Sequence, residues 1–358
     1  MSVWLTKPFE LCINKVTYTK KVQRNAFMDE GPYPVISQEE AFINGYWNNE
    51  ADVFKVSNPV VLFGDHTKIL KYVDFDFVLG ADGVKILQPK DFLLPKFFYY
   101  QLQSVDIGSL GYARHYRLLK EQSIVYPNIP EQRRIVGILD EAFEGIATAK
   151  ANAEKNLVNA RALFESHLND VFTRRGKGWV ETTLDKISTN LDSQRIPITK
   201  NVRSSGEYPY YGASGIVDYV AEYIFDGDAL LVSEDGANLL ARSTPIAFSV
   251  TGKYWVNNHA HILHFDNIAT QRFAEFYLES IPLDEYITGA AQPKLNQKAL
   301  NSIPIPIPKS VEEQAKIVEG VDSLCEQTRR LESLYRRKLE ALEALKKSLL
   351  HQAFAGEL

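Results

Sequence analysis

Two polar loops in the second half of the chain carry residue types that could hydrogen-bond to nucleic-acid bases. They are Gln194, Arg195, Lys200 and Arg203 in one loop, and Gln292, Lys294 and Asn296 in the other. Glutamine and asparagine side chains suit adenine, whereas arginine and lysine suit guanine or a backbone phosphate. The chemistry that these loops could do is therefore the reading of a double helix in its major groove.

The first half of the chain carries candidate residues at corresponding places. Some fall in the loop that corresponds to residues 292–296, some lie near the position that corresponds to Lys200, and two more are candidates for phosphate contacts. In chain order they are Lys20, Lys21, Arg24, Lys68, Lys71, Arg114, His115 and Arg117. A single lysine or arginine on a loop is usually just solvated. The hypothesis therefore depends on the sets, not on any one residue.

No pattern in the sequence indicates catalysis. The phosphate-binding loop, the His-Glu-x-x-His zinc motif and the Gly-x-Ser-x-Gly elbow are all absent from the sequence. Asn58-Pro59-Val60-Val61 does not supply the Asn-Pro-Pro-Tyr type of adenine methyltransferase motif. His259, His261 and His264 cluster, but alternate residues of a strand point to opposite faces, so they do not form a predicted metal site. We expect no catalytic residue, metal or cofactor.

Charge and composition narrow the class of protein. The 358 residues carry a net charge of −5, which argues against loose coating of DNA but not against a focused basic groove. Cys12 and Cys325 are too few for a disulfide framework or a thiolate metal site. The first residues lack the layout of a secretory signal, and no apolar run reaches the roughly 18–20 residues that span a bilayer. We expect a cytoplasmic protein.

The chain repeats itself. The residues EQRRIV at 131–136 reappear as EQAKIV at 313–318, and the match continues without a gap as far as Phe172 and Phe354. Upstream the match is looser: Trp4 corresponds to Trp179, and the Tyr-Pro pair at 33–34 corresponds to that at 208–209. Self-similarity at one long period predicts two copies of one unit, each of about 175 to 180 residues.

Each copy has two parts with different periodicity. The first part is rich in short apolar runs between turn residues and predicts a mixed α/β domain, with short helices at 96–103 and 271–280. The second part is helical, and Asn128 with Glu131 and Ser310 with Glu313 are capping boxes that mark where each long helix begins.

The long helices carry apolar seams at three- and four-residue steps. Along the second helix the predicted seam is Val321, Leu324, Thr328, Leu331, Tyr335, Lys338, Leu342, Leu345 and Leu349. The first helix is richer in alanine at the matching positions and also places polar Asn156 and His167 there. Large residues can pack against small ones, so we expect an antiparallel coiled coil within the chain. The alternative is that each helix packs only on its own domain.

This arrangement predicts a tandem repeat with pseudo-twofold symmetry. A helix from 140 to 174 would be roughly 50 Å long, whereas one turn of DNA is about 34–36 Å. Two readers held by such a spacer could approach one duplex a turn or more apart. Because their sequences differ, the two half-sites should differ as well.

The chain resembles the specificity subunits of type I restriction–modification systems. The second copy carries the resemblance, with YPYYGASGIVDY at 208–219, SEDGAN at 233–238 and GAAQPKLN at 289–296. Further matching stretches are 195–197, 223–227, 303–306, 313–318 and 353–358. The first copy matches in layout and helix but departs in its recognition half, where residues 111–116 stand in place of 289–294.

The resemblance implies a specific division of the chain. It implies two target-recognition domains at 1–127 and 176–309, a central spacer helix at 128–175 and a C-terminal spacer helix at 310–358. Such a subunit reads a bipartite, asymmetric site on double-stranded DNA. It implies as partners two modification subunits that methylate adenine, joined for restriction by nuclease/translocase subunits, and it implies no membrane.

Two other hypotheses belong to different classes. The first is a non-catalytic coiled-coil adaptor whose domains bind proteins, which the net acidity favours. The second is a self-contained nuclease or methyltransferase, which the missing motifs oppose.

Overall fold

The computed structural model describes residues 3–81, 83–108, 111, 113–289 and 291–358. The chain folds as two compact units. Unit 1 comprises Met1–Glu154 together with Arg337–Leu358, and unit 2 comprises Lys155–Arg336. Each unit contains one mixed domain of strands and short helices, together with part of each long helix. Among the described residues, no helix combines the length and the apolar character needed to cross a membrane.

The mixed domain of unit 1 consists of small sheets covered by helices. Its elements are β1 (Leu5–Pro8), α1 (Phe9–Cys12), β2 (Ile13–Asn14), β3 (Lys21–Val22), β4 (Tyr33–Ile36), β5 (Gly45–Trp47), β6 (Val53–Phe54), β7 (Val60–Gly64), β8 (Leu70–Val73), β9 (Phe77–Gly80), β10 (Val84–Pro89), α2 (Pro95–Ser104), α3 (Tyr116–Lys120) and β11 (Ser123–Tyr126). The sheets have the orders β2-β10-β7-β8 and β3-β9-β4-β5, with β6 also paired to β9, and β1 pairs with β11. The long helix α4 (Ile129–Thr173) follows.

The mixed domain of unit 2 has its own set of elements. They are β12 (Trp179–Thr183), α5 (Leu184–Ile187), β13 (Thr189–Asn190), β14 (Ser205–Gly212), β15 (Gly215–Val220), β16 (Phe225–Asp226), β17 (Ala229–Ser233), α6 (Asn238–Ala241), β18 (Ala247–Val250), β19 (Lys253–Val256), β20 (Ala260–His264), α7 (Ile268–Ser280), β21 (Ile287–Thr288), β22 (Lys294–Leu295), α8 (Gln297–Asn301) and β23 (Pro304–Pro308). The long helix α9 (Val311–Ala355) follows.

The two mixed domains share one sheet topology. The order β13-β20-β17-β18 in unit 2 matches β2-β10-β7-β8 in unit 1, and β15-β14-β19-β16 matches β5-β4-β9-β6. The parallel pair also corresponds, because β4 runs parallel to β9 as β14 does to β19. The strand β3 in unit 1 and the hairpin β21–β22 in unit 2 are extra elements. The apolar central strands β7 and β17 are buried along their whole length.

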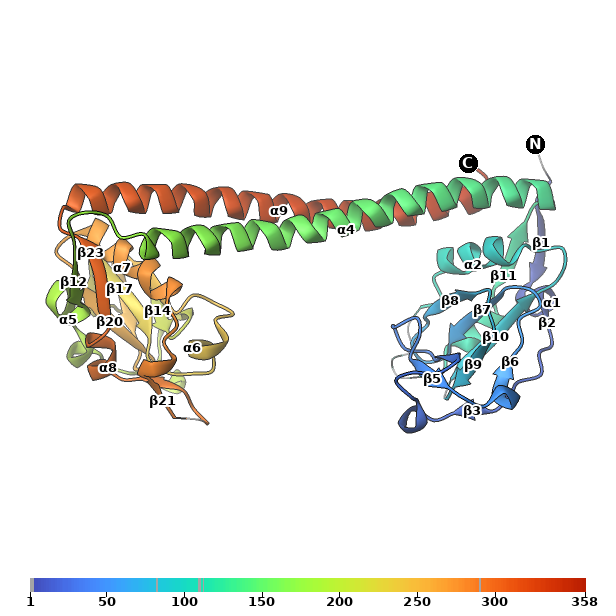
Figure 1. The fold of residues 1–358 in the computed structure, drawn as a ribbon, viewed down its shortest axis with the longest axis horizontal. Coiled ribbons are helices and arrows are strands. Elements are labelled where there is room, and N and C mark those ends of the chain that lie inside the picture. Colours follow the sequence, from blue (N-terminus) through green and yellow to red (C-terminus); the bar gives the residue numbers. More distant parts are fainter. Residues whose placement is uncertain (1–2, 82, 109–110, 112, 290) are drawn as a thin grey trace. The chain divides into compact units, whose positions relative to one another are not determined.

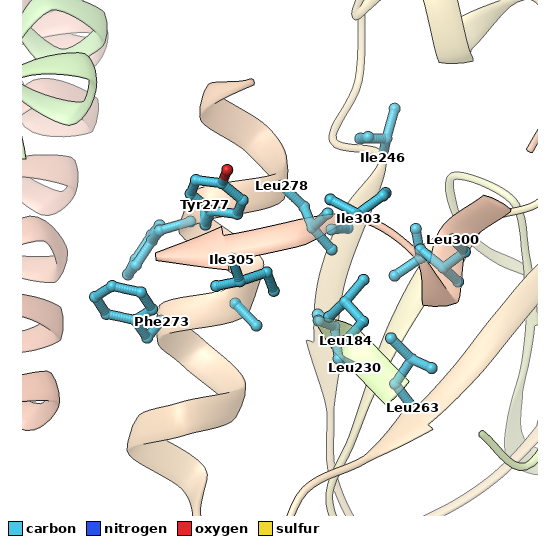
Figure 2. Packing of buried hydrophobic residues seen from close by; sticks show 14 of the residues in the cluster. Leu184, Leu230, Ile246, Leu263, Phe273, Tyr277, Leu278, Leu300, Ile303 and Ile305 are labelled. Atoms are coloured by element: carbon cyan, nitrogen blue, oxygen red, sulfur yellow. The ribbon is translucent and has the colours of Figure 1, made fainter. Parts of the chain in front are cut away.

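Both long helices contribute to the core of each unit. In unit 2 the core contains Leu168 and Phe172 near the end of α4, and Val318 and Val321 near the start of α9. In unit 1 the core contains Ile135 and Leu139 near the start of α4, with Leu350 and Ala353 near the end of α9. Figure 2 shows the centre of the unit 2 core, where side chains from α7, β17, β20 and β23 meet.

The helices run side by side in opposite directions within each unit (Figure 1). In unit 1 Lys150 pairs with Glu343 at 2.8 Å, and in unit 2 Arg161 pairs with Glu332 at 2.5 Å. The buried alanines Ala153 and Ala160 leave room for larger residues opposite. The predicted fold class, mixed α/β domains with two long helices in an antiparallel coiled coil, is thus confirmed. The alternative, with each helix packed only on its own domain, is wrong.

The seam differs from the predicted one at alternate positions. Asn156, His167 and Lys338, which the sequence pattern places on the seam, are exposed, and the adjacent Leu157, Leu168 and Leu339 face inward instead. In exchange, Leu331 and Leu345 face solvent, while their neighbours Glu332 and Lys346 are half-buried. Two alternative seams share every seventh residue, so periodicity alone does not choose between them. Packing against the partner helix does.

Candidate nucleic-acid interface

Three loops of unit 2 meet beside Glu234, the residue that directly follows strand β17. The backbone N–H of Leu295 donates to the Glu234 carbonyl oxygen at 2.8 Å, and that of Gly236 donates to Pro293 at 3.0 Å. These bonds attach the loop that ends in β22 to residues 234–236. The third loop begins with the short 3-10 helix Asp192–Gln194 and reaches the same place through Arg195. The structure therefore brings together the two polar loops predicted from the sequence.

The Glu234 carboxylate holds one cation from each of these loops. Its Oε2 lies 2.7 Å from Nη1 of Arg195, and its Oε1 lies 3.1 Å from Nζ of Lys294. The Arg195 side chain is 14% exposed, whereas that of Lys294 is 51% exposed. Burial alone would raise the pKa of Glu234, but the hydrogen bonds and charges of Arg195, His261 and Lys294 lower it overall. Glu234 is therefore a buried anion beside an accessible cation.

His261 closes the same network from β20. Its buried ring has Nδ1 2.5 Å from Oδ2 of Asp192 and Nε2 2.7 Å from the carbonyl oxygen of Leu295. Burial would raise the pKa of Asp192, but its bonds with His261 and Ile262 and the charge of Arg195 lower it, so this carboxylate is ionised. Both ring nitrogens thus lie at hydrogen-bond distance from an oxygen atom, and the ring ties Asp192 to Leu295.

This cluster also has the spacing of a metal site. Asp192, Glu234 and His261 offer ligand atoms within 4.8 Å of one another. Arg195 and Lys294 already bring positive charge to the two carboxylates, and both nitrogens of His261 already lie within hydrogen-bond distance of protein oxygen atoms. A metal ligand must instead be a neutral imidazole with a free lone pair. The cluster is better described as an ion-pair network that joins the three loops.

Some of the remaining candidate residues of unit 2 are exposed, and others are hydrogen-bonded within the protein. Gln194, Lys200 and Gln292 are exposed. Arg203 donates from Nη1 to Asp218 at 3.1 Å and lies over the Tyr210 ring, so it braces its own loop. The Asn296 side-chain oxygen accepts from the backbone of α8 at 2.9 Å, which makes Asn296 the N-cap of that helix. The cap uses one of the two lone pairs of this oxygen and leaves the amide NH2 available for further hydrogen bonds.

In unit 1 the loop before α3 is attached in a similar way. Asp65 directly follows β7, and its carbonyl oxygen accepts from the backbone N–H of His115 at 2.7 Å. The His115 ring is buried, with Nδ1 3.1 Å from the same oxygen, so it is not accessible to a ligand. Arg114 and Arg117 on either side are exposed. Tyr112 and Ala290, which belong to the two corresponding loops, lie outside the described residues.

The other candidates of unit 1 are placed differently from one another. Lys71 is 4% exposed, and its Nζ donates to the carbonyl oxygens of Ser37 and Ala41 at 3.0 and 2.5 Å. Burial lowers the pKa of Lys71 to about 8. Lys71 therefore holds the segment 37–44 in place and does not face a phosphate. Lys68 donates to the carbonyl oxygen of Gly108 at 2.9 Å.

Near the N-terminus, Lys20 is exposed and Lys21 is half-buried. The Lys21 ammonium lies 5.3 Å from the centre of the Tyr18 ring. Arg24 forms an ion pair with Glu39. Lys20 and Arg24 are thus both exposed, and the Arg24 side chain is 68% exposed despite its ion pair.

Sequence reasoning missed the acidic residues at the centre of these sites. Glu234 follows the apolar run ALLVS, and Asp65 follows VVLFG, so the same strand-then-acid pattern occurs in both copies. A buried strand that ends on a carboxylate in both repeats is a signal that could have indicated them. Their roles depend on which loops pack beside them, and that information is tertiary.

The chain is similar in sequence to known proteins. Residues 176–342 match the family model of the type I restriction modification DNA specificity domain. A Haemophilus influenzae chain named as a type I restriction enzyme specificity subunit is 36% identical over 141 residues, which cover 39% of this chain and only 36% of that relative. The EcoR124I/EcoR124II specificity subunit of Escherichia coli is 26% identical over 336 residues, covering 84% of this chain and 81% of that one.

Two solved structures share the fold. One comes from work on the structural basis of complex assembly and conformational transition of the type I R-M system. It has a TM-score of 0.73 at 15% identity, and the match covers 99% of this chain and 98% of that one. The HsdS subunit from Thermoanaerobacter tengcongensis has a TM-score of 0.57 at 16% identity, covering 99% and 97%. At these identities the likeness concerns the fold alone.

Proposed function

We propose that the chain, which is similar to type I restriction–modification specificity subunits, is such a subunit and reads one bipartite, asymmetric DNA sequence for a restriction–modification complex. Residues 1–127 and 176–309 serve as two target-recognition domains, and the helices in 128–175 and 310–358 serve as spacers. The chain itself supplies recognition, and the methyl transfer and cleavage belong to its partner subunits.

The observation that carries this proposal is one scaffold with two different loops. In both units an acidic residue follows the central strand. Its backbone carbonyl oxygen accepts a hydrogen bond from a backbone N–H in the loop before a short helix. The loop residue just before that bond is Arg114 in unit 1 and Lys294 in unit 2. A shared framework with divergent contact residues is what two unlike half-sites require.

The proposed contact residues are the accessible ones. Lys71 and His115 are buried, and Arg195 and Arg203 are largely buried and brace their loops, whereas Arg24 stays 68% exposed although it is paired with Glu39. The proposed DNA contacts are then Lys20, Lys21, Arg24, Lys68, Arg114, Arg117, Gln194, Lys200, Gln292, Lys294 and Asn296.

The long helices provide the proposed surface for the partners. In unit 2, Val158, Leu163, Leu331 and Leu334 are all at least 40% exposed although they are large and apolar. Large apolar side chains that remain exposed are available for contacts with partner proteins. We propose that two modification subunits bind along these helices, and that restriction subunits join the resulting complex.

Footprinting of the chain in complex with its modification subunits tests the proposal. The complex should protect one two-part sequence, and scrambling either half-site should weaken binding by about 10³-fold or more, as for specific against non-specific DNA. Equal affinity for all duplexes would contradict the proposal. The first step is to find the site as the methylated two-part motif that disappears from the source genome when this chain is deleted.

A protein-binding adaptor is the second candidate, favoured by the net charge of −5. Salt separates the two functions, because each phosphate contact releases counterions and makes the affinity for DNA fall steeply with salt concentration. Binding of other proteins with an affinity that depends neither on DNA sequence nor on salt concentration would support the adaptor.

A further inference from the structure

We infer that Glu234 is a positioning residue that presents Lys294 to a guanine in the half-site read by unit 2. The inference rests on the proposed function and names one base and two residues within it. It assigns to Glu234 a role that is separate from DNA contact: the carboxylate orients the Lys294 ammonium and keeps it from binding any nearby phosphate.

The backbone of Lys294 is fixed on both sides. The backbone of Lys294 pairs with Thr288 in the β21–β22 hairpin and forms an isolated antiparallel β-bridge with Asp235. The backbone N–H of the next residue, Leu295, donates to the carbonyl oxygen of Glu234 at 2.8 Å. The Glu234 Oε1 then holds the side chain at its end, 3.1 Å from Nζ. A long lysine side chain has many rotamers in solution, and holding it in one of them in advance lowers the entropic cost of binding.

Glu234 is itself held in place. Its Oε2 accepts from Nη1 of Arg195 at 2.7 Å, and Arg195 also donates to the carbonyl oxygens of Ala260 and Asp192 at 2.8 and 3.2 Å. Arg195 is thus attached to the backbone of two other elements and is largely buried. The carboxylate is therefore held independently of Lys294, and Lys294 is the more exposed member of the pair.

The hydrogen-bond capacity of the ammonium points to guanine. An ammonium has three N–H donors, and Glu234 takes one of them. The remaining donors match the two acceptors, O6 and N7, that guanine presents in the major groove. A phosphate, in contrast, would bring its negative charge close to the Glu234 carboxylate, and like charges repel. The pair therefore favours a neutral base edge over the DNA backbone.

The corresponding position in unit 1 lacks this arrangement. Arg114 stands where Lys294 stands, but Oδ1 of the Asp65 carboxylate accepts from the backbone N–H of Tyr116 at 2.8 Å. The Asp65 side chain is only 3% exposed, and Lys85 lies 3.9 Å from its Oδ2. Unit 1 thus provides an internal comparison in which the acidic residue braces the backbone and pairs at the edge of ion-pair distance with a lysine of a neighbouring strand.

The test uses the full chain in complex with its modification subunits and four variants: Glu234→Gln, Lys294→Gln, the double variant, and Lys298→Gln. Lys298 is exposed on α8 and serves as the control, because its substitution removes the same charge from the same unit. The affinity is measured for the cognate duplex, for a duplex with a scrambled second half-site, and for duplexes with each guanine of that half-site replaced by adenine.

We expect Glu234→Gln to strengthen binding to the scrambled duplex and to leave or weaken binding to the cognate one. The ratio of the two affinities should fall about tenfold, within the range for one base contact. Lys294→Gln should abolish discrimination at one guanine only, and the double variant should discriminate no worse than Lys294→Gln. Lys298→Gln should change both affinities by the same factor.

Two outcomes would overturn the inference. One is a Glu234→Gln complex that folds but keeps the wild-type ratio. The other is a Lys294→Gln complex that still prefers guanine at every position. This second result is decisive even if Glu234→Gln does not fold, because Lys294 is half exposed and its replacement should leave the fold intact. Failure of the proposed function looks different, since the wild-type complex would then not distinguish cognate from scrambled DNA.

Discussion

Unit 1 and unit 2 build the same two sheets but use the residue after the central strand differently. In unit 1 the Asp65 carboxylate accepts from the backbone N–H of Tyr116, whereas in unit 2 the longer Glu234 reaches two cationic side chains. The backbone bond to the following loop is present in both. The comparison teaches that the scaffold depends on backbone bonds, which tolerate sequence change, while side chains are free to diverge.

The attachment of each domain to its long helices is more alike. Gln132 and Gln314, at the same position in the two helices, are buried and hydrogen-bonded to the domain below. Asp140 of α4 pairs with Lys96 of α2, as Asp322 of α9 pairs with Arg272 of α7. Positions that join domain to helix are therefore kept alike in both copies, whereas loop positions differ. The predictions below test this contrast.

The largest effect is expected where the end of a long helix packs on a domain. Phe172→Ala should cost about 3–5 kcal/mol of unfolding free energy, because Phe172 is 6% exposed and contacts Phe273 and Tyr277 edge to face. The equivalent Phe354→Ala should cost less, about 2 kcal/mol, because Phe354 is only half-buried. Urea denaturation measures both, and hydrogen exchange assigns each loss to its unit. A larger cost for Phe354 would contradict the expected order.

The next largest loss of unfolding free energy is expected when the buried glutamines Gln132 and Gln314 are replaced. Gln132 makes three hydrogen bonds to backbone groups, with Leu94, Phe92 and Pro127. Gln314 makes two hydrogen bonds: it accepts from the Thr270 hydroxyl and donates to the backbone carbonyl oxygen of Pro308. Replacement by alanine leaves buried polar groups without partners, so we expect about 3 kcal/mol for Gln132→Ala and about 2 kcal/mol for Gln314→Ala. Equal and negligible losses in urea denaturation would show that these bonds do not join domain to helix.

Acid should destabilise unit 2 more than unit 1. The pKa values of Asp192 and Glu234 in unit 2 are lowered in the folded protein, so their stabilisation is present above about pH 4.5 and is lost as the pH falls. In unit 1 the carboxyl groups with lowered pKa values, Asp76, Glu131 and Glu343, are partly exposed surface groups that solvent screens. Unit 2 should therefore lose more stability between pH 5 and pH 3, as followed by hydrogen exchange.

Glu234→Gln provides the control for the acid experiment, because it removes one of the two carboxylates. The pKa of Glu279 is raised by burial, an opposite contribution that is common to both proteins and cancels in the comparison. The variant should show a shallower loss of stability in acid. The same slope in both proteins would mean that the Glu234 network does not stabilise unit 2.

The smallest effects are expected at the helix caps. The Asn128 side chain accepts from the backbone of Glu131 at 3.1 Å, and the Ser310 hydroxyl accepts from that of Glu313 at 3.3 Å. Asn128→Ala and Ser310→Ala should each cost about 1 kcal/mol, since the two residue types cap equally well. Urea denaturation should show the two costs to be similar, and glycine at either site should restore most of the loss. A large difference between the sites would break the parallel between the units.

The sequence by itself determined the repeat, the element types and the start of each long helix. The helices begin at Ile129 and Val311, directly after the predicted caps, and α2 and α7 cover the predicted segments 96–103 and 271–280. Capping and periodicity act over a few residues, so they can be read along the chain.

Only the tertiary structure decided which of the marked residues are available and what they contact. Nothing near Lys71 in the sequence distinguishes it from Lys68, yet the segment 37–44 folds over it and takes its hydrogen bonds. Likewise Leu157 replaced Asn156 on the helix seam, and Glu234 met Lys294 from 60 residues away along the chain. Burial and pairing depend on which segments pack together, and this is decided by contacts between residues that are distant in sequence.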